Sequence, residues 1–377
     1  MLRYFATNRA IDQLGRAVDQ REDRLTLQKG GYYFVDMDQY MRFYLGTLET
    51  EEMSGKAIVK NSSQGVFDDF LKDPRVGKIV VCVHGFNVEL FEAFTWFRIL
   101  TNTMKHMDDA GCRIVTAPGD LAELGDAEPE SLTGFIGFSW PSNGNVLSYP
   151  SDQREAVRSA SAFASLLGRL KATGKSINLI CHSMGNYLAC HTFAALVNKE
   201  VVPPAFVDQA DLRNLLERGE KSDDEEIVRD GYLIDRFVMI APDVERRHVT
   251  KSWGEGQETE YVGPFYSGLQ HLVKSKLNVY SRFDAALAVS DVEKRPREAL
   301  LAAGDAVSKL SFGLLDFLER NPDQKWEKRL GEAPAPVNAA PGFTSLNATE
   351  IAGRKIDHSD HIDAQPIAGE IMKALEV

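Results

Sequence analysis

One serine in this chain has the surroundings of a catalytic nucleophile. Residues 177–186 are Ile-Asn-Leu-Ile-Cys-His-Ser-Met-Gly-Asn, in which a short apolar run leads into a turn centred on Ser183, and an amphipathic helical pattern follows. A strand, a sharp turn and a helix in this order hold a serine in a strained conformation with its hydroxyl exposed. Because strand and helix approach closely there, small residues are needed two positions either side. Gly185 meets this need, and Cys181 stands where the usual pattern has glycine.

A second motif could supply the electrostatic part of the same chemistry. Residues 79–87 are Ile-Val-Val-Cys-Val-His-Gly-Phe-Asn, a buried-strand pattern that ends in a His-Gly turn. In α/β hydrolases a loop of this kind gives one backbone N–H to the oxyanion hole, and the residue after the nucleophile gives the other. We therefore expect the N–H groups of Phe86 and Met184 to stabilise the oxyanion. The His84 side chain is expected to be structural.

The base that would activate Ser183 must come late in the chain. A serine hydroxyl needs a histidine to take its proton, and in this fold the order is serine, carboxylate, histidine, each after a strand. Three later histidines precede the last predicted strands or lie on the helix after the turn: His191, His248 and His271. Only His358 and His361 follow the final predicted strand, at about residues 350–356. We favour His358, which directly follows that strand, and keep His361 as the alternate.

Two carboxylates are candidates for the residue that orients the histidine. Asp284 follows the predicted strand at 277–280, the second-last strand, which is the usual place. Asp243 follows the preceding strand at 237–241 and is the alternate. We prefer Asp284 and expect the other aspartate to line the pocket or to cap a helix.

The elements that must position these residues alternate between strands and helices. Strands are predicted at 2–5, 32–35, 79–83, 114–116, 134–140, 177–180, 237–241, 277–280 and 350–356, and helices at 88–107, 152–172 and 366–375. The first two strands are expected to be antiparallel. The pattern predicts the α/β-hydrolase fold, a mostly parallel central sheet with helices on both faces, as a single domain over residues 1–377.

Four segments fall outside this alternation. Residues 118–132 are acidic and without a periodic pattern, and the Pro-rich residues 331–342 predict a loop. Residues 200–231 are predicted to form an acidic helical insertion on the surface, whose charge-dense part is 208–230. Residues 243–271 contain several aromatic side chains, and we interpret them as a lid or pocket wall, whose aromatic lining favours an apolar acyl group.

Composition narrows the classes of function. The net charge of −12 argues against nucleic acid or an anionic membrane as the main partner. No apolar run approaches the roughly 18 residues of a membrane span, and the first residues lack the apolar core of a signal peptide. The four cysteines have no Cys-x-x-Cys spacing, so we expect a reduced, cytoplasmic protein. Without a GxGxxG motif, a P-loop or a cluster with ligand spacing, no cofactor and no metal are expected.

Further motifs extend the pattern over nearly the whole chain. They are Tyr-Phe-Ala-Thr-Asn-Arg at 4–9, Val-His-Gly-Phe-Asn at 83–87, Phe-Ser-Trp-Pro at 138–141, His-Ser-Met-Gly at 182–185, Ala-Pro-Asp at 241–243, Tyr-Ser-Arg-Phe-Asp-Ala-Ala-Leu at 280–287, Arg-Leu-Gly at 329–331 and His-Ser at 358–359. With these motifs the sequence resembles an uncharacterised bacterial family of α/β hydrolases, a domain of unknown function of the serine-hydrolase type. The resemblance implies hydrolase activity on an undefined substrate. It supports Ser183 and His358 and leaves Asp243 and Asp284 open.

The leading hypothesis from sequence is a serine hydrolase that cleaves an ester or related acyl bond in a small molecule through an acyl-enzyme intermediate. A peptidase, thioesterase or acyltransferase on the same three residues is a second possibility. A third is a non-catalytic binding or scaffold protein that keeps the hydrolase fold, since fold alone does not imply function. The oligomeric state is left open.

Overall fold

The computed structural model describes eleven stretches of the chain. They are residues 4–9, 32–36, 63–107, 113–116, 118–124, 128–142, 149–198, 231–253, 260–284, 286–287 and 329–377. The predicted acidic insertion, with its charge-dense part at 208–230, lies outside the described residues except for its last position.

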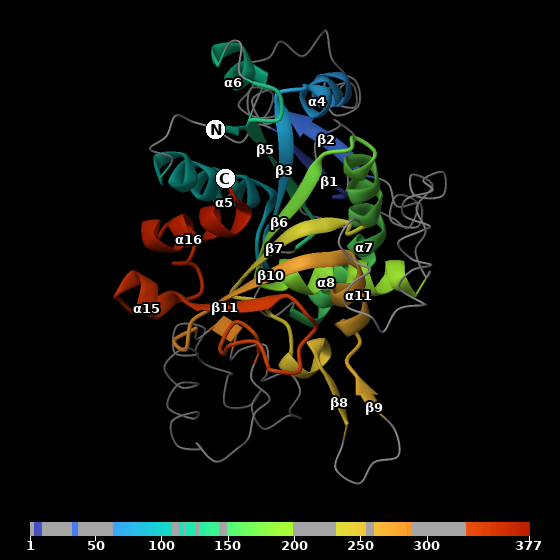
Figure 1. Ribbon diagram of the computed structural model, residues 1–377, viewed down its shortest axis with the longest axis vertical. Coiled ribbons are helices and arrows are strands. Elements are labelled where there is room, and N and C mark those ends of the chain that lie inside the picture. Colours follow the sequence, from blue (N-terminus) through green and yellow to red (C-terminus); the bar gives the residue numbers. More distant parts are fainter. Residues whose placement is uncertain are drawn as a thin grey trace.

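A single large sheet forms the centre of the described structure (Figure 1). Its strands are β1 (Tyr4–Thr7), β2 (Tyr33–Asp36), β3 (Val76–Val83), β4 (Ile114–Val115), β5 (Leu132–Ser139), β6 (Ser176–His182), β7 (Ile234–Ile240), β10 (Val273–Tyr280) and β11 (Phe343–Asn347). They are ordered β11-β10-β7-β6-β3-β5-β1-β2, and β4 pairs with β5. β1 and β2 are antiparallel, as predicted, and the other pairs in this sheet are parallel.

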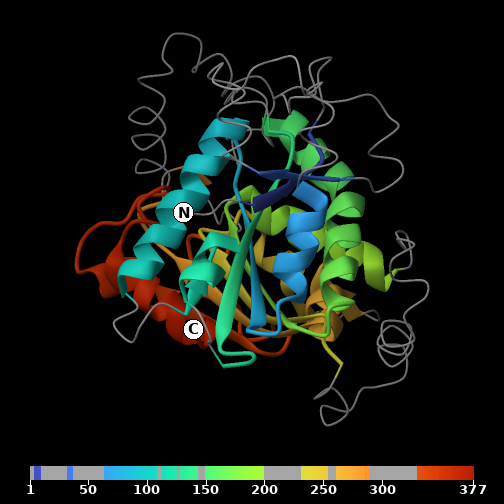
Figure 2. The same cartoon turned by 90° about the horizontal axis from the view of Figure 1, so that it is seen from above.

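Helices cover both faces of this sheet (Figures 1 and 2). One face carries α5 (Leu90–Met107), α15 (Ala348–Ala352) and α16 (Gln365–Leu375), and the other carries α4 (Ser63–Lys72), α7 (Tyr149–Lys171), α8 (Met184–Val197) and α11 (Tyr266–Leu272). The predicted α/β-hydrolase architecture is confirmed. None of the described helices has the length and apolar character needed to cross a lipid bilayer.

The two faces of the sheet belong to two separate apolar cores because side chains alternate along a strand. In β3, Ile79, Val81 and Val83 join the core beneath α7 and α8, while Val80 and Cys82 join the core beneath α5 and α16. Parallel strands buried on both faces are apolar throughout, which explains why the sequence shows continuous apolar runs there.

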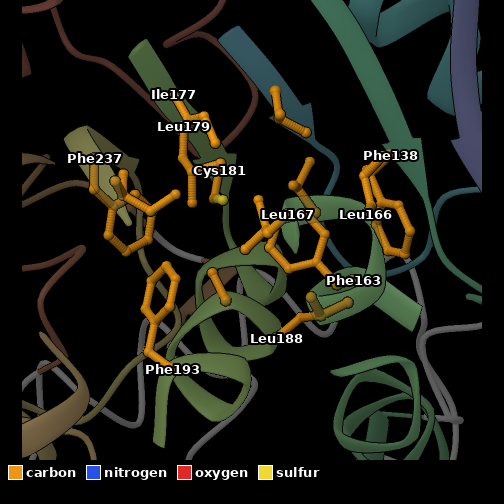
Figure 3. Packing of buried hydrophobic residues seen from close by; sticks show 14 of the residues in the cluster. Phe138, Phe163, Leu166, Leu167, Ile177, Leu179, Cys181, Leu188, Phe193 and Phe237 are labelled. Carbon is orange, nitrogen blue, oxygen red and sulfur yellow. The ribbon is translucent and has the colours of Figure 1, made fainter. Parts of the chain in front are cut away.

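The core on the α7 and α8 side holds the strand and helix on either side of the predicted nucleophile (Figure 3). Leu179 of β6 and Leu188 of α8 belong to this core, and Phe163 of α7 packs against Phe138 of β5, with ring centroids 4.9 Å apart. Phe193 of α8 packs against Phe237 of β7, with ring centroids 5.9 Å apart. Dense packing of this kind leaves the junction between β6 and α8 little freedom to relax.

Two predicted elements were wrong. Residues 118–132 contain a short helix, α6 (Pro118–Glu123), and their last position begins β5. The final strand is β11, at Phe343–Asn347, and not at 350–356. The Asn347 side chain caps α15 by accepting a hydrogen bond from the Thr349 N–H at 3.2 Å, and Gly353 ends that helix with φ +63°. His358 therefore lies in the loop between α15 and α16 and does not directly follow a strand.

The segment 243–271, described at 243–253 and 260–271, follows the end of β7. It comprises the 3₁₀ helix η3 (Arg246–Val249), the antiparallel strands β8 (Lys251–Trp253) and β9 (Glu260–Val262), and part of α11. Tyr261 and Val262 on β9 are exposed. Its function as a lid or pocket wall stays a prediction, as does the division into domains.

Candidate active site

Ser183 has the strained backbone that the turn between β6 and α8 requires. Its φ is +50° and its ψ is −123°, in a region that L-residues other than glycine rarely adopt. The Ser183 N–H donates to the Ile240 carbonyl at 3.0 Å, and the Ser183 carbonyl accepts from the Asp243 N–H at 3.2 Å. These bonds to the chain that leaves β7 hold the turn in place.

The predicted base and one of the predicted acids lie together. His358 Nδ1 is 2.8 and 2.9 Å from the two carboxylate oxygens of Asp284, which is buried after β10. Burial lowers the pKa of His358, but the charge and hydrogen bond of Asp284, together with the charges of Asp243 and Asp357, raise this pKa by more, and the net shift is upward. A carboxylate on Nδ1 leaves Nε2 as the nitrogen that can accept a proton.

Asp243, the alternate acid, is occupied by other partners. Its Oδ2 accepts from the Tyr149 hydroxyl at 2.5 Å, and its Oδ1 lies 2.6 Å from Arg329 Nη1. All three side chains are buried. Asp243, Tyr149 and Arg329 thus form a buried polar cluster next to the nucleophile turn. The Tyr149 ring also packs edge-on against Phe86, with ring centroids 5.3 Å apart.

His361, the alternate base, contacts the main chain of His358. Its Nδ1 lies 3.2 Å from the His358 carbonyl, and its side chain is fully buried. His182 reaches the same carbonyl through Nε2, at 3.0 Å. Both imidazoles can donate to this oxygen only through a protonated nitrogen, which defines the tautomer of each when neutral. Burial lowers the pKa of both histidines.

The two predicted oxyanion donors lie on either side of the turn. Met184 is the first residue of α8, where backbone N–H groups have no partner within the helix and the helix dipole favours negative charge. Phe86 lies on the loop after β3, and that loop comes close to the nucleophile: a Cβ added to Gly85 would meet the Ser183 Cβ at 2.8 Å. Within the described chain, no hydrogen bond is formed by the N–H of Phe86 or of Met184.

His84 makes structural contacts, at the base of that loop. Its Nδ1 donates to the Gly85 carbonyl at 2.9 Å, because its Nε2 already accepts from the Trp140 N–H at 3.2 Å. The ring stacks on the Trp140 indole, 5.4 Å between centroids. Burial lowers the pKa of His84 to about 3, so it stays neutral.

Two of the remaining histidines, His191 and His248, contact the ring of Phe265. His191 packs in a ring cluster with Tyr187 and Phe265, at 4.4 and 4.8 Å between centroids. His248 contacts the same Phe265 ring.

Among the residues that the structure describes, no group of three or more His, Cys, Asp or Glu side chains has the geometry to hold a metal ion.

Comparison with known proteins places this chain in a family. The family model described as "Alpha/beta hydrolase of unknown function (DUF900)" matches residues 59–298. The chain belongs to this family. An uncharacterized protein of Nostoc sp. (strain PCC 7120) is 40% identical over 374 residues, which is 98% of this chain and 92% of the relative. Among solved structures, an esterase of Pyrobaculum calidifontis aligns over 81% of this chain and 77% of its own at 12% identity, with a TM-score of 0.33.

Sequence reasoning missed one residue that holds the turn of this α/β hydrolase. The Asn186 side-chain amide lies 3.1 Å from the Cys181 carbonyl, 3.1 Å from the Ser183 carbonyl and 3.3 Å from the Ile240 carbonyl. A buried amide that ties the turn to both neighbouring strands restricts the position of the serine. The signal in the sequence is a polar residue on the first turn of a largely apolar helix.

The close approach at Gly185 leads to a testable prediction for the hydrolase. A Cβ added there would lie 2.5 Å from the His84 carbonyl oxygen and 3.0 Å from that of Val83. We expect Gly185→Ala to lower the free energy of unfolding by about 1–3 kcal/mol through overpacking, measured by urea unfolding. Gly369→Ala on α16 is the matched control, because its added Cβ would meet only the flexible end of Met107 at 3.4 Å. The two variants showing equal stability would contradict the prediction.

Proposed function

We propose that this α/β hydrolase is a serine hydrolase that cleaves an ester or related acyl bond of a small molecule through an acyl-enzyme. The observation that carries the proposal is the pairing of His358 Nδ1 with the buried Asp284 carboxylate at 2.8 Å. The His358 ring contacts His182, which directly precedes the serine with positive φ. A scaffold that only binds a partner has no need of a buried carboxylate on a histidine or of a strained serine.

In the proposed mechanism Ser183 Oγ attacks the substrate carbonyl carbon. His358 Nε2 takes the hydroxyl proton and then gives it to the leaving group, while Asp284 keeps the imidazole in the required tautomer and stabilises its charged form. The N–H groups of Phe86 and Met184 donate to the oxyanion. Water, activated by the same histidine, then releases the acyl group from Ser183 and restores the free enzyme.

A fluorophosphonate probe tests the proposal directly. We expect wild-type protein to be labelled, and peptide mass spectrometry to place the phosphonyl group on Ser183, because such probes react with an activated serine. Folded protein that stays unlabelled by fluorophosphonates, and that turns over no p-nitrophenyl ester, would favour the scaffold hypothesis. A panel of esters, thioesters and peptides then separates the reaction types that share this mechanism.

The raised pKa of His358 predicts the pH dependence of the reaction. A protonated imidazole cannot accept the Ser183 proton, so kcat/KM falls as the pH drops through the pKa of His358. Because Asp284 raises that pKa, we expect the acid-side midpoint above the ordinary histidine value of about 6.5. Asp284→Asn should move the midpoint to lower pH. A wild-type midpoint below about 6.5 would contradict the assignment of His358.

A further inference from the structure

The motifs at residues 4–9 and 138–141 take no part in the proposed bond cleavage. Both contact the loop that carries Phe86, through Arg9 and Trp140. We call residues 84–89 the oxyanion loop. Thr7 is the last residue of β1 and Ser139 the last residue of β5. These strands are parallel neighbours, with Thr7 opposite Ser139. The Thr7 hydroxyl donates to the Ser139 carbonyl at 2.7 Å, so the two chains leave the sheet side by side.

Arg9 joins both motifs to the oxyanion loop. Its guanidinium is fully buried and donates through three nitrogens: Nε to Ser139 Oγ at 3.0 Å, Nη1 to the Ser142 carbonyl at 3.4 Å and Nη2 to the Val88 carbonyl at 2.8 Å. A planar guanidinium with donors in a fixed fork holds several acceptors in one geometry, which a lysine ammonium cannot reproduce.

Ser142 holds the other backbone group of the same loop residue. Its buried Oγ accepts from the Val88 N–H at 3.2 Å and donates to Asp152 Oδ2 at 2.7 Å. Asp152 is buried on α7. The carboxylate orients the hydroxyl so that its lone pair faces Val88, whose N–H and C=O are therefore both fixed from outside the loop.

The beginning of the oxyanion loop is fixed as well. The Trp140 indole N–H donates to the His84 carbonyl at 3.0 Å, and His84 Nδ1 holds the Gly85 carbonyl. Phe86 therefore lies between two anchored positions. Asn87, between Phe86 and Val88, has a φ of +57°, which lets the chain turn sharply before the second anchor.

We propose that Arg9, Ser142 and Asp152 form a clamp on Val88 that positions the Phe86 N–H for the oxyanion. The proposal rests on the proposed serine-hydrolase function. An oxyanion donor must lie 2.7–3.1 Å from the developing charge and must already be in place when the charge forms. Val88 is only two residues from Phe86, so a loosened Val88 shifts the donor directly. These three side chains are positioning residues, which act on the reaction through the loop.

The test compares Ser142→Ala with Ser165→Ala. Ser165 is a half-buried serine of α7 that donates to the Ser161 carbonyl at 3.1 Å, so the control removes one serine hydroxyl bond away from the site. For Ser142→Ala we expect faster amide exchange at Val88, by about two- to tenfold, the equivalent of one net hydrogen bond. With p-nitrophenyl acetate, kcat should fall by about 10–100-fold at nearly unchanged KM, less than the 10²–10³-fold cost of removing a donor.

A second variant and a second readout keep the test decisive. Arg9→Lys keeps the charge but loses the fork, and should change the exchange rate and kcat in the same direction. Fluorophosphonate labelling should slow in parallel with kcat, since the phosphonyl oxygen occupies the oxyanion hole. Control-like exchange at Val88 in folded Ser142→Ala would overturn the clamp, even for a wild-type protein without hydrolase activity. Faster exchange with unchanged kcat would overturn its effect on catalysis, whereas an unlabelled wild type would refute the proposed function itself.

Discussion

Ser183→Ala should lose all turnover above the level that substrate binding and the oxyanion hole provide alone. Removing the nucleophile of a serine–histidine–carboxylate site typically costs about 10⁶-fold in kcat. We therefore expect no acyl-enzyme, no fluorophosphonate adduct and no burst of p-nitrophenol in rapid-mixing experiments. The measurement is the steady-state rate with p-nitrophenyl acetate together with intact-protein mass spectrometry.

The loss in Ser183→Ala must come from chemistry and not from unfolding. The serine has a positive φ, which alanine tolerates poorly too, so the variant should be no more than modestly less stable than wild type. Ser165→Ala, on α7, makes the same substitution outside the site and should keep full activity. Wild-type turnover in a folded Ser183→Ala protein would refute the proposed mechanism.

Asp284→Asn should reduce kcat by about 10⁴-fold, because an amide on Nδ1 allows the wrong imidazole tautomer. Both carboxylate oxygens lie within hydrogen-bond distance of His358 Nδ1, at 2.8 and 2.9 Å. KM should change little, since in the proposed mechanism the carboxylate acts through His358 and not on the substrate. Steady-state kinetics over a range of pH measures both quantities.

Asp243→Asn is the comparison that separates the two acids. It breaks the buried ion pair between Asp243 and Arg329, and removing one charge of such a pair typically costs about 3–5 kcal/mol of stability. We expect a lower midpoint of unfolding, while the folded fraction keeps a much larger share of its kcat than Asp284→Asn does. The reverse order of the two kcat losses would transfer the role of the acid to Asp243.

The sequence by itself determined the parts of the site that depend on short stretches of chain. The turn around Ser183 could be predicted because a strand period, two small residues and a helix period meet within ten positions. The oxyanion loop could be predicted for the same reason. The alternation of strands and helices was enough for the fold class, which the family match confirms. The predicted strand at 350–356 was wrong because its apolar residues were given more weight than two helix signals. These signals are Asn347, which caps the start of α15, and Gly353, which ends it.

Only the tertiary structure decided which side chains meet. Asp243 and Asp284 each follow a strand, so the sequence favoured Asp284 and left Asp243 open. The order β7-β10-β11 in the sheet brings Asp284 to His358, 74 positions later. The buried supports of the site could not be foreseen either. Arg9 lies 79 positions before Val88, and a buried guanidinium looks like an ordinary surface charge in a sequence. Local periodicity records which face of an element is buried, whereas the partner of a polar group is determined by how distant elements pack.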